Sequence, residues 1–361
     1  MKMIVRRTAL AVCTLVLAVT LSTAASAACT GFDDVPESAD CYESVMYLAE
    51  HEITQGTGKG CFSPDAPVTV RQWAMMLCRA YDVKVEGSSW SDLSQSAVEQ
   101  SYRKGWLNET ALSAPRSPMC RSMLVESAFA AADIPVYDST LYEGGASLST
   151  ADNILRVGRE LGLCSDDADT NALVTRGDAA IILHVVLTQS FRIEEPPVPV
   201  TLVNAAGVNV NDFLLELRKL PEQVLDAFNA AGWTYCIDFD YMGGLSKKLN
   251  MSCIGATNYS QKTIYISEAS ATLHEFGHFL DWTLGFPAEH EQLFRAEAAA
   301  APLRNYAKTN AREYFADCFA YCIIHGNDSE MMKSLRKNAP QTCTYFEELG
   351  KDIWSRSIRS K

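Results

Sequence analysis

The sequence is short of several features that would each define a class of protein. Beyond its first residues it has no apolar run long enough to span a bilayer, so we expect no transmembrane helix. Basic residues are outnumbered, 31 Lys and Arg against 44 Asp and Glu, and a net charge of -13 disfavours nucleic acid as a partner. The 12 cysteines lack the dense, regular spacing of a disulfide scaffold.

The N-terminus has the composition of a secretory signal peptide. Basic residues precede an apolar run over residues 9–21, and Ala25-Ser26-Ala27 offers a small-x-small cleavage site. We expect residues 1–27 to be removed and the mature protein to be secreted. A retained anchor is less favoured because the apolar run is short, and lipidation of Cys29 is less favoured because Ser26 stands where lipoprotein signals carry leucine.

A proline-rich stretch divides the mature chain. IEEPPVPV, residues 193–200, combines three prolines with two acids, which excludes a helix and predicts a stiff, exposed linker over residues 191–200. The linker separates an N-terminal part, residues 29–190, from a C-terminal part, residues 201–361. We therefore expect a multidomain protein.

The N-terminal part repeats with a period near fifty residues, over about 32–83, 90–137 and 138–189. The first unit has an acidic opening, a helical pattern, a glycine-rich turn and a Val-Thr cap before a second helix. The second unit keeps the opening and the first helix. The third unit keeps the helix start Val174-Thr175-Arg176-Gly177-Asp178.

These units resemble S-layer homology repeats, whose signature is an FxDV opening, a glycine-rich turn and a TRAE-like helix start. The resemblance implies an all-α module that binds an anionic secondary cell-wall polysaccharide at the cell wall or S-layer surface of a bacterium. In that family the arginine of the TRAE-like start faces the polymer. Arg176 is the best match for it, and Arg71 is displaced by one position. A helical spacer that has lost ligand binding is the alternative.

The C-terminal part changes from helical to strand periodicity and back. VNDFLLELRKL and PEQVLDAFNAAG have apolar residues at helical spacing, whereas WTYCIDFD and KTIYIS are rich in β-branched and aromatic residues. A helix containing HEFGH follows, so we expect an α+β domain. On this helix His274 and His278 lie one turn apart and can share a metal ion, while Glu275 is rotated away from them. An exposed histidine pair without a metal is the alternative.

A third ligand is needed to distinguish a metal site from a chance occurrence of the HExxH pattern. The extension HExxHxxGxxH is absent, because Asp281 and Leu284 stand where Gly and His are required. Glu313 lies in the first turn of a later helix, and Asp317 is one turn further along the same face. A capping-box role beside Asn310 is the alternative for Glu313.

HEFGH, YAKTNAREYFAD and RKNAPQT resemble the catalytic domain of the lethal factor family and the related secreted Pro-Pro endopeptidases. The resemblance implies a zincin-like metallopeptidase domain over residues 201–361. The zinc ligands it implies are His274, His278 and Glu313. It makes Glu275 the general base, and Tyr306 faces the scissile carbonyl. Asp317 stands where the family has an acid behind a ligand, and we expect it, together with Asp281, to orient a ligand imidazole.

These features predict a cell-wall-anchored zinc endopeptidase that hydrolyses extended segments of surface or extracellular proteins. Pro-Pro bonds are the preference that the resemblance implies, and Pro196-Pro197 makes self-release from the wall a corollary. We expect the strand KTIYIS, residues 262–267, to form the cleft edge, and Trp282 to line the cleft or pack in the core. The alternatives are a non-catalytic wall-binding protein or adhesin, and an exported toxin-like protease.

Cys318 and Cys322, with His325, form a second group that has the composition of a metal cluster. Their spacing puts them on one face of an apolar helix, and buried free cysteines are the favoured interpretation.

Overall fold

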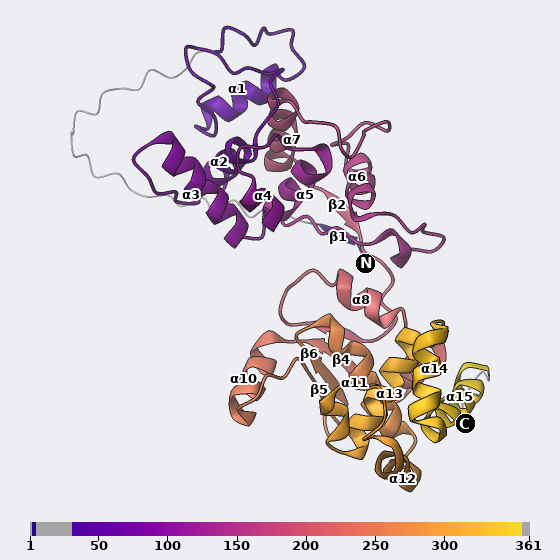
Figure 1. Cartoon of the computed structure of the whole chain (residues 1–361). Coiled ribbons are helices and arrows are strands. Elements are labelled where there is room, and N and C mark those ends of the chain that lie inside the picture. Colours follow the sequence, from indigo (N-terminus) through magenta and orange to yellow (C-terminus); the bar gives the residue numbers. More distant parts are fainter. Residues whose placement is uncertain (1, 5–30, 356–361) are drawn as a thin grey trace. The chain divides into compact units, whose positions relative to one another are not determined.

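The computed structural model describes residues 2–4 and 31–355, which fall into two compact units (Figure 1). Unit 1 comprises residues 1–140 and 144–195, and unit 2 comprises residues 141–143 and 196–361. Apart from Lys2–Ile4, the predicted signal peptide lies outside the described residues. The division into units falls within the proline-rich stretch.

Unit 1 is built almost entirely of helices. Its α-helices are α1 (Tyr42–Glu50), α2 (Val70–Ala80), α3 (Trp90–Arg103), α4 (Glu109–Ser113), α5 (Arg121–Ala131), α6 (Thr150–Glu160) and α7 (Arg176–Thr188). A short 3-10 helix, η1, covers Ser139–Leu141, and β1 (Lys2–Ile4) pairs antiparallel with β2 (Arg192–Glu194). Thr69 and Thr175 cap α2 and α7, as the Val-Thr pairs predict.

Three short segments of unit 1 hydrogen-bond to one another in a closed ring. The backbone N–H of Val68 donates to Val174, that of Val174 donates to Met119, and that of Met119 donates to Val68, over 2.9, 3.0 and 2.9 Å. Each segment directly precedes the last helix of one predicted repeat, α2, α5 or α7. The ring therefore joins the same position of the three predicted repeats.

Unit 2 combines a small sheet with many helices. Its helices are α8 (Asn211–Leu217), α9 (Glu222–Ala230), α10 (Phe239–Leu249), η2 (Ala269–Ala271), α11 (Thr272–Thr283), α12 (Ala288–Glu297), η3 (Asn305–Lys308), α13 (Ala311–His325), α14 (Ser329–Asn338) and α15 (Pro340–Ser355). Its strands are β3 (Leu202–Asn204), β4 (Thr234–Ile237), β5 (Gly255–Asn258) and β6 (Thr263–Ile266).

The strand order corrects the predicted position of the cleft edge. The order is β3-β4-β6-β5, in which β3, β4 and β6 are parallel and β5 is antiparallel to β6. The predicted edge strand, KTIYIS, is β6, and it has a neighbour on both sides. The edge is β5 instead, a strand that sequence reasoning missed because GATN has little β-propensity.

Helix α11 lies in the interior of unit 2. Phe276 and Phe279 are fully buried, and their rings contact Phe228, with centroids 4.8 and 5.1 Å apart. Trp282 packs on Trp233 at 5.1 Å, so it belongs to this aromatic cluster. Of the two predictions for Trp282, core packing is the one that the structure supports.

The proline-rich stretch is less exposed than predicted. Pro196 and Val200 are buried, and the carbonyl of Pro199 accepts a hydrogen bond of 2.8 Å from Asn229 Nδ2. Pro197 and Val198 are exposed, so one member of the Pro196-Pro197 pair is buried and the other is open to solvent. Self-cleavage between them would require Pro196 to leave its buried position, because an extended, accessible chain is needed there.

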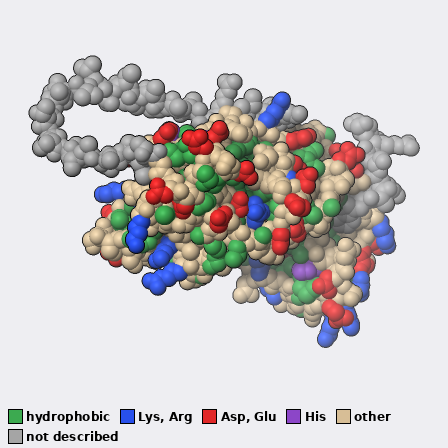
Figure 2. Space-filling model, turned by 90° about the horizontal axis from the view of Figure 1, so that it is seen from above, with side chains coloured by type: hydrophobic (Ala, Val, Ile, Leu, Met, Phe, Trp, Pro, Cys, Tyr) green, Lys and Arg blue, Asp and Glu red, His purple; other side chains and the backbone are tan. Residues whose placement is uncertain are grey.

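Acidic groups are spread over the surface. On the face shown in Figure 2, carboxylate side chains are scattered among apolar ones, and basic side chains stand singly between them, consistent with the net charge of -13. The ten cysteines in the described part are all free thiols, including Cys318 and Cys322. Within residues 2–4 and 31–355, no helix is both long and apolar enough to cross a membrane.

Candidate metal centre

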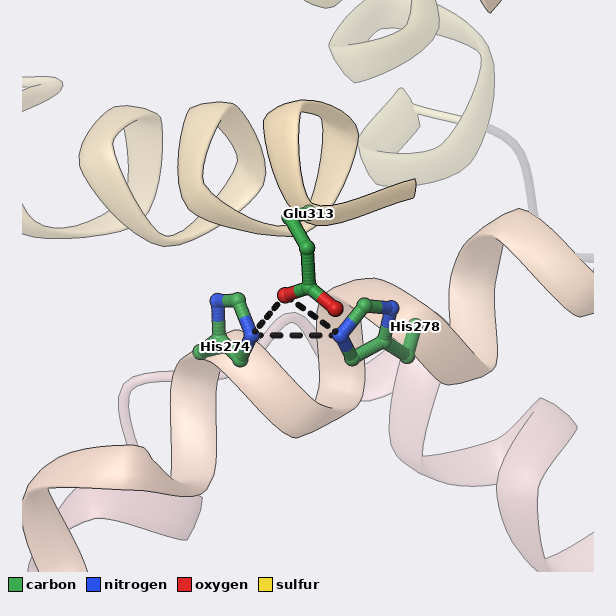
Figure 3. A group of neighbouring side chains, drawn as sticks. All are labelled: His274, His278 and Glu313. Atoms are coloured by element: carbon green, nitrogen blue, oxygen red, sulfur yellow. Dashed lines mark hydrogen bonds and ion pairs between the residues drawn. The ribbon is translucent and has the colours of Figure 1, made fainter. Parts of the chain in front are cut away.

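Helix α11 supplies two imidazoles that face each other. His274 and His278 are each 8% exposed, and their Nε2 atoms lie 3.1 Å apart (Figure 3). The spacing of four residues places both rings on one face of the helix, as the sequence predicts. The alternative of an exposed histidine pair does not fit this burial.

Glu313 reaches this pair from the start of α13. The side chain of Asn310 caps the helix by accepting from the backbone N–H groups of Arg312 and Glu313, at 3.0 and 3.1 Å. Glu313 occupies the capping-box position, but its carboxylate points across to the imidazoles instead. Its Oε2 lies 3.0 Å from His274 Nε2 and 3.3 Å from His278 Nε2.

These three atoms have the spacing of a tetrahedral metal site. Zinc bonded to nitrogen and oxygen at about 2.0–2.1 Å holds its ligand atoms about 3.3 Å apart. His274, His278 and Glu313 form the one such group found among the described residues. Two imidazole nitrogens and a carboxylate oxygen converging on one point also match the ligand chemistry of zinc.

Asp317 fixes the orientation of His274 from one turn further along α13. Its Oδ1 accepts a hydrogen bond of 2.6 Å from His274 Nδ1, so the Nε2 lone pair faces Glu313. Burial alone would lower the pKa of His274, but the hydrogen bonds to Asp317 and Glu313 raise it to about 9. A proton and a metal ion would therefore compete for the same Nε2 atom.

His278 and Asp281 differ from their expected arrangement. No described residue hydrogen-bonds to the buried Nδ1 of His278, so this ring lacks a counterpart to Asp317. Asp281, predicted to help orient a ligand imidazole, accepts from Nδ1 of His290 at 2.7 Å instead. Nε2 of His290 contacts the Tyr345 hydroxyl at 2.7 Å. Asp281 therefore ties α11 to α12 and α15, away from the metal centre.

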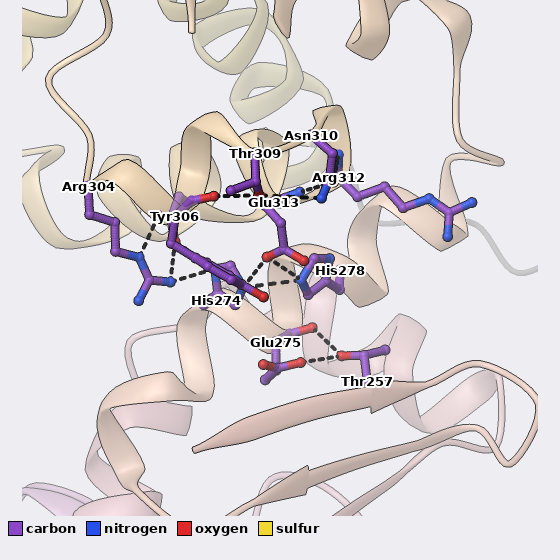
Figure 4. Close-up of polar contacts among 11 residues, drawn as sticks. Thr257, His274, Glu275, His278, Arg304, Tyr306, Thr309, Asn310, Arg312 and Glu313 are labelled. Atoms are coloured by element: carbon purple, nitrogen blue, oxygen red, sulfur yellow. Dashed lines mark hydrogen bonds and ion pairs between the residues drawn. The ribbon is translucent and has the colours of Figure 1, made fainter. Parts of the chain in front are cut away.

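Glu275 points from α11 toward the edge strand, on the wall of the same cavity as His274. Its Oε2 accepts a hydrogen bond of 2.7 Å from Thr257 Oγ1, and its Oε1 lies beside Gly255 (Figure 4). A Cβ at Gly255 would stand 2.6 Å from Oε1, so only glycine leaves room for the carboxylate. Sequence reasoning found neither β5 residue, because no periodic pattern marks them.

Tyr306 lies in η3 with its hydroxyl directed toward the same cluster (Figure 4). The side chain is 42% exposed, and its ring centroid is 6.1 Å from that of His274. Burial and the negative charge of Glu313 raise the pKa of Tyr306 to about 12. The hydroxyl therefore remains a hydrogen-bond donor at neutral pH.

A cavity of about 610 Å³ opens beside these groups. Its wall includes His274, Glu275, Tyr306, Asp317 and a residue absent from our predictions, Arg304. Apolar side chains complete it, namely Met251, Ile254, Leu303 and Ile324. The metal centre therefore faces a space large enough for a side chain and a stretch of backbone. We call this space the cleft.

The two predicted polymer-binding arginines of unit 1 differ in their burial. Arg176 is 4% exposed, and its Nε donates to the carbonyl of Phe62 at 2.8 Å. Its guanidinium lies 4.5 Å from the centroid of the Phe62 ring, near the charge of Asp34. This burial does not fit an arginine that meets a polymer at the surface. Arg71 is half-buried, and its backbone N–H donates to the carbonyl of Pro115.

Unit 1 also has a cavity of its own, of about 400 Å³. It lies beside the glycine-rich turn, and Arg176 lines it together with Arg79 and Trp90. Arg79 and Trp90 were not predicted as site residues. A cation and an aromatic ring can together bind an acidic carbohydrate if they are accessible. Trp90 is 46% exposed, so we treat both residues as functional candidates.

Two imidazoles and a carboxylate thus converge from two facing helices, next to an edge strand, in an arrangement that could hold a metal ion. The comparison with known families gives two matches. Residues 218–349 match the family described as anthrax toxin lethal factor, N- and C-terminal domain, and residues 31–69 match the S-layer homology domain. The comparison with curated proteins found no match.

The family matches confirm the two resemblances noted in the sequence. The lethal factor-like stretch contains all three candidate metal ligands, and that family is zinc-dependent. S-layer homology domains bind secondary cell-wall polymers, which indicates association with a bacterial cell surface. The chain is therefore similar to a surface-associated, toxin-like protein with a lethal factor-like domain.

Proposed function

We propose that unit 2 is a zinc-dependent endopeptidase with a zincin-like fold, held at the cell surface by unit 1. The convergence of His274, His278 and Glu313 on one point is the observation that carries the proposal. These three residues would hold the metal. When bound, zinc polarises a peptide carbonyl and makes water acidic enough to attack at neutral pH.

The protein groups around the triad have complementary tasks. Glu275 accepts the proton of the attacking water and passes it to the leaving amine. Thr257 holds Oε2 of Glu275, which leaves Oε1 beside Gly255 free to take that proton. The Tyr306 hydroxyl donates to the carbonyl oxygen as negative charge develops on it.

The edge strand gives the substrate its expected conformation. β5 pairs with β6 along one side, and the cleft begins at its N-terminal residue, Gly255. An extended chain can add to such an edge through main-chain hydrogen bonds. Extended, proline-containing segments of surface or extracellular proteins therefore remain our proposed substrates, with Pro-Pro bonds as the narrower hypothesis.

Unit 1 is proposed to hold the enzyme on an anionic secondary cell-wall polysaccharide. The residues that we assign to this role are Arg79 and Trp90, because they line the unit 1 cavity and the predicted Arg176 is buried. The test is sedimentation of the full chain with purified bacterial cell walls. Trp90→Ala should leave more protein in the supernatant than the wild type does.

The peptidase activity is tested with a peptide library read by mass spectrometry. The wild-type chain should cleave a subset of peptides, and Glu275→Gln should keep its zinc while losing roughly 10²–10⁴-fold in rate, the usual contribution of a general base. Cleavage at an unchanged rate by Glu275→Gln would reject the mechanism. A wild type that binds zinc and cleaves nothing would instead favour the non-catalytic surface protein.

A further inference from the structure

Arg304 is a cationic side chain on the wall of the cleft that the mechanism above leaves without a role. It directly precedes η3 and stands two residues before Tyr306. Its side chain is 55% exposed, whereas its partner Asp317 is 8% exposed. The pair therefore has one buried member and one that is open to the cleft.

The guanidinium is held from one side. Nε donates to Asp317 Oδ2 at 2.6 Å, and Nη2 donates to Oδ1 at 2.7 Å. Nη2 also lies 3.2 Å from His274 Nδ1, because both nitrogens donate to the same oxygen. Among the described residues Nη1 has no hydrogen-bond partner, so its two N–H groups remain available.

The position of Arg304 along the cleft indicates which part of a substrate it meets. Antiparallel pairing is the more stable way for an extended chain to add to β5. The C-terminal end of that chain would then run toward Met251, which with Gly255 and Arg304 lines the cleft. The guanidinium therefore lies on the side of the residues that follow the scissile bond.

The charges around Arg304 favour a neutral acceptor over an acid. Asp317 already offsets the charge of the guanidinium through two hydrogen bonds. Glu275 and Glu313 add two more carboxylates to the same site, and a bound zinc ion would leave the whole group near neutrality. A substrate carboxylate would gain little there, whereas a carbonyl oxygen needs only the free N–H groups.

We propose that Arg304 binds the main-chain carbonyl oxygen of the substrate residue directly after the scissile bond. The inference rests on the proposed peptidase function. Through its other edge Arg304 also positions Asp317, and through it His274. One planar side chain would thus align the substrate with the metal ligand. Lysine is less suited to both tasks, because it has a single ammonium group.

The test compares two amide-capped peptides, one that the wild type cleaves and an analogue in which a trans carbon–carbon double bond replaces the amide bond of that carbonyl, so that the acceptor is lost and no charge is added. The wild type should lose roughly 10- to 100-fold in kcat/KM on the analogue, the range for a hydrogen bond to a charged group. Arg304→Gln should be slower on the parent peptide by a similar factor. Removing the carbonyl should then cost that variant less than about threefold, because the two changes remove the same contact.

A second readout does not depend on turnover. In the Glu275→Gln background both peptides survive, and their dissociation constants can be measured by fluorescence anisotropy. The carbonyl should tighten binding when Arg304 is present and should have little effect in the Glu275→Gln, Arg304→Gln double variant. Zinc content is measured for each variant, and Arg304→Lys, which keeps the charge beside Asp317, replaces Arg304→Gln if that variant loses its metal.

Arg312 provides a matched control. It points away from the cluster on the opposite side from Arg304 and stacks on Phe286, with its Cζ 4.2 Å from the ring centroid (Figure 4). Arg312→Gln removes the same charge, and it should retain the wild-type penalty for loss of the carbonyl.

Two results would overturn the contact. If loss of the carbonyl lowers kcat/KM equally in the wild type and in Arg304→Gln, Arg304 does not contact the carbonyl and only positions Asp317. If a peptide that ends in a free carboxylate after that residue binds more tightly than the amide-capped peptide, Arg304 recognises the C-terminus of a substrate rather than a main-chain carbonyl. A wild type that cleaves no library peptide is a distinct result, which withdraws both this inference and the peptidase proposal.

Discussion

Two motifs stand out in the sequence, and their side chains end in opposite environments. Arg176 of unit 1 turns inward to the carbonyl of Phe62, whereas the HEFGH residues of unit 2 converge beside a cleft of about 610 Å³. Both segments begin helices at the expected place. A motif match therefore indicates a position in a fold, and the surrounding contacts decide whether the side chain is available for function.

The same difference appears in how charge is balanced. In unit 1 the Nε of Arg176 donates to a carbonyl oxygen, and the charge of Asp34 lies near its guanidinium. In unit 2, three ligand atoms face one another at 3.0 to 3.3 Å, where a metal ion would compete with protons for them. Substitution of Arg176 should thus affect stability, and substitution of the three ligand residues should affect chemistry.

Removal of a metal ligand gives the largest expected effect. His278→Ala should lose the zinc and all measurable cleavage, because two ligands on separate helices hold the ion far less tightly than three. The aromatic contacts of Phe276 and Phe279 should keep α11 folded. Metal analysis by mass spectrometry, with circular dichroism for the fold, checks this. A full equivalent of tightly bound zinc in the variant would remove His278 from the site.

The second-largest effect is expected from substitution of the buried Arg176, and it should be an effect on stability. Arg176→Ala should lower the free energy of unfolding of unit 1 by about 1.5–3 kcal/mol, the usual contribution of a hydrogen bond that involves a charged group. Hydrogen exchange read by mass spectrometry can locate the loss to unit 1. Arg71→Ala is the control, with an expected change within about 0.5 kcal/mol for a partly exposed side chain. Weakened wall binding with unchanged protection would instead give Arg176 a direct role in binding.

Helix periodicity explains how much of the site could be predicted. A spacing of four residues puts His274 and His278, or Glu313 and Asp317, on one helix face wherever the helix lies. Arg304, Thr257 and Gly255 come from a loop and an edge strand, where no period relates the residue number to its direction. The edge strand itself was missed because GATN has little β-propensity, and the more hydrophobic β6 was predicted as the edge instead.

A smaller effect is expected at the hydroxyl that faces the metal centre. Tyr306→Phe should fold and bind zinc normally and lose roughly 10²-fold in kcat, the lower end of the range for one oxyanion donor, since the side chain is 42% exposed. Steady-state kinetics on a peptide found in the library separate kcat from KM. A change confined to KM would mean that Tyr306 only positions the substrate.

The smallest expected effect tests the contact that brings the two halves of the metal centre together. Gly277, between the two histidines, lies where α11 meets α13, and a Cβ there would stand 2.6 Å from Ala316 Cα and 2.8 Å from its carbonyl oxygen. These are backbone atoms, so the helices must move apart to admit a methyl group. Gly277→Ala should therefore cost about 1–3 kcal/mol of stability and weaken zinc binding, because Glu313 moves away with α13.

A glycine in another helix of unit 2 separates this effect from helix propensity. At Gly243, in α10, an added Cβ meets no atom within 4 Å. Gly243→Ala should stabilise the protein by about 0.5–1 kcal/mol, the usual gain for alanine over glycine in a helix, and leave zinc binding unchanged. Thermal unfolding and zinc titration of both variants make the comparison. If Gly277→Ala behaves like Gly243→Ala, close helix contact does not set the geometry of the ligands, and the HEFGH glycine has no structural role in the site.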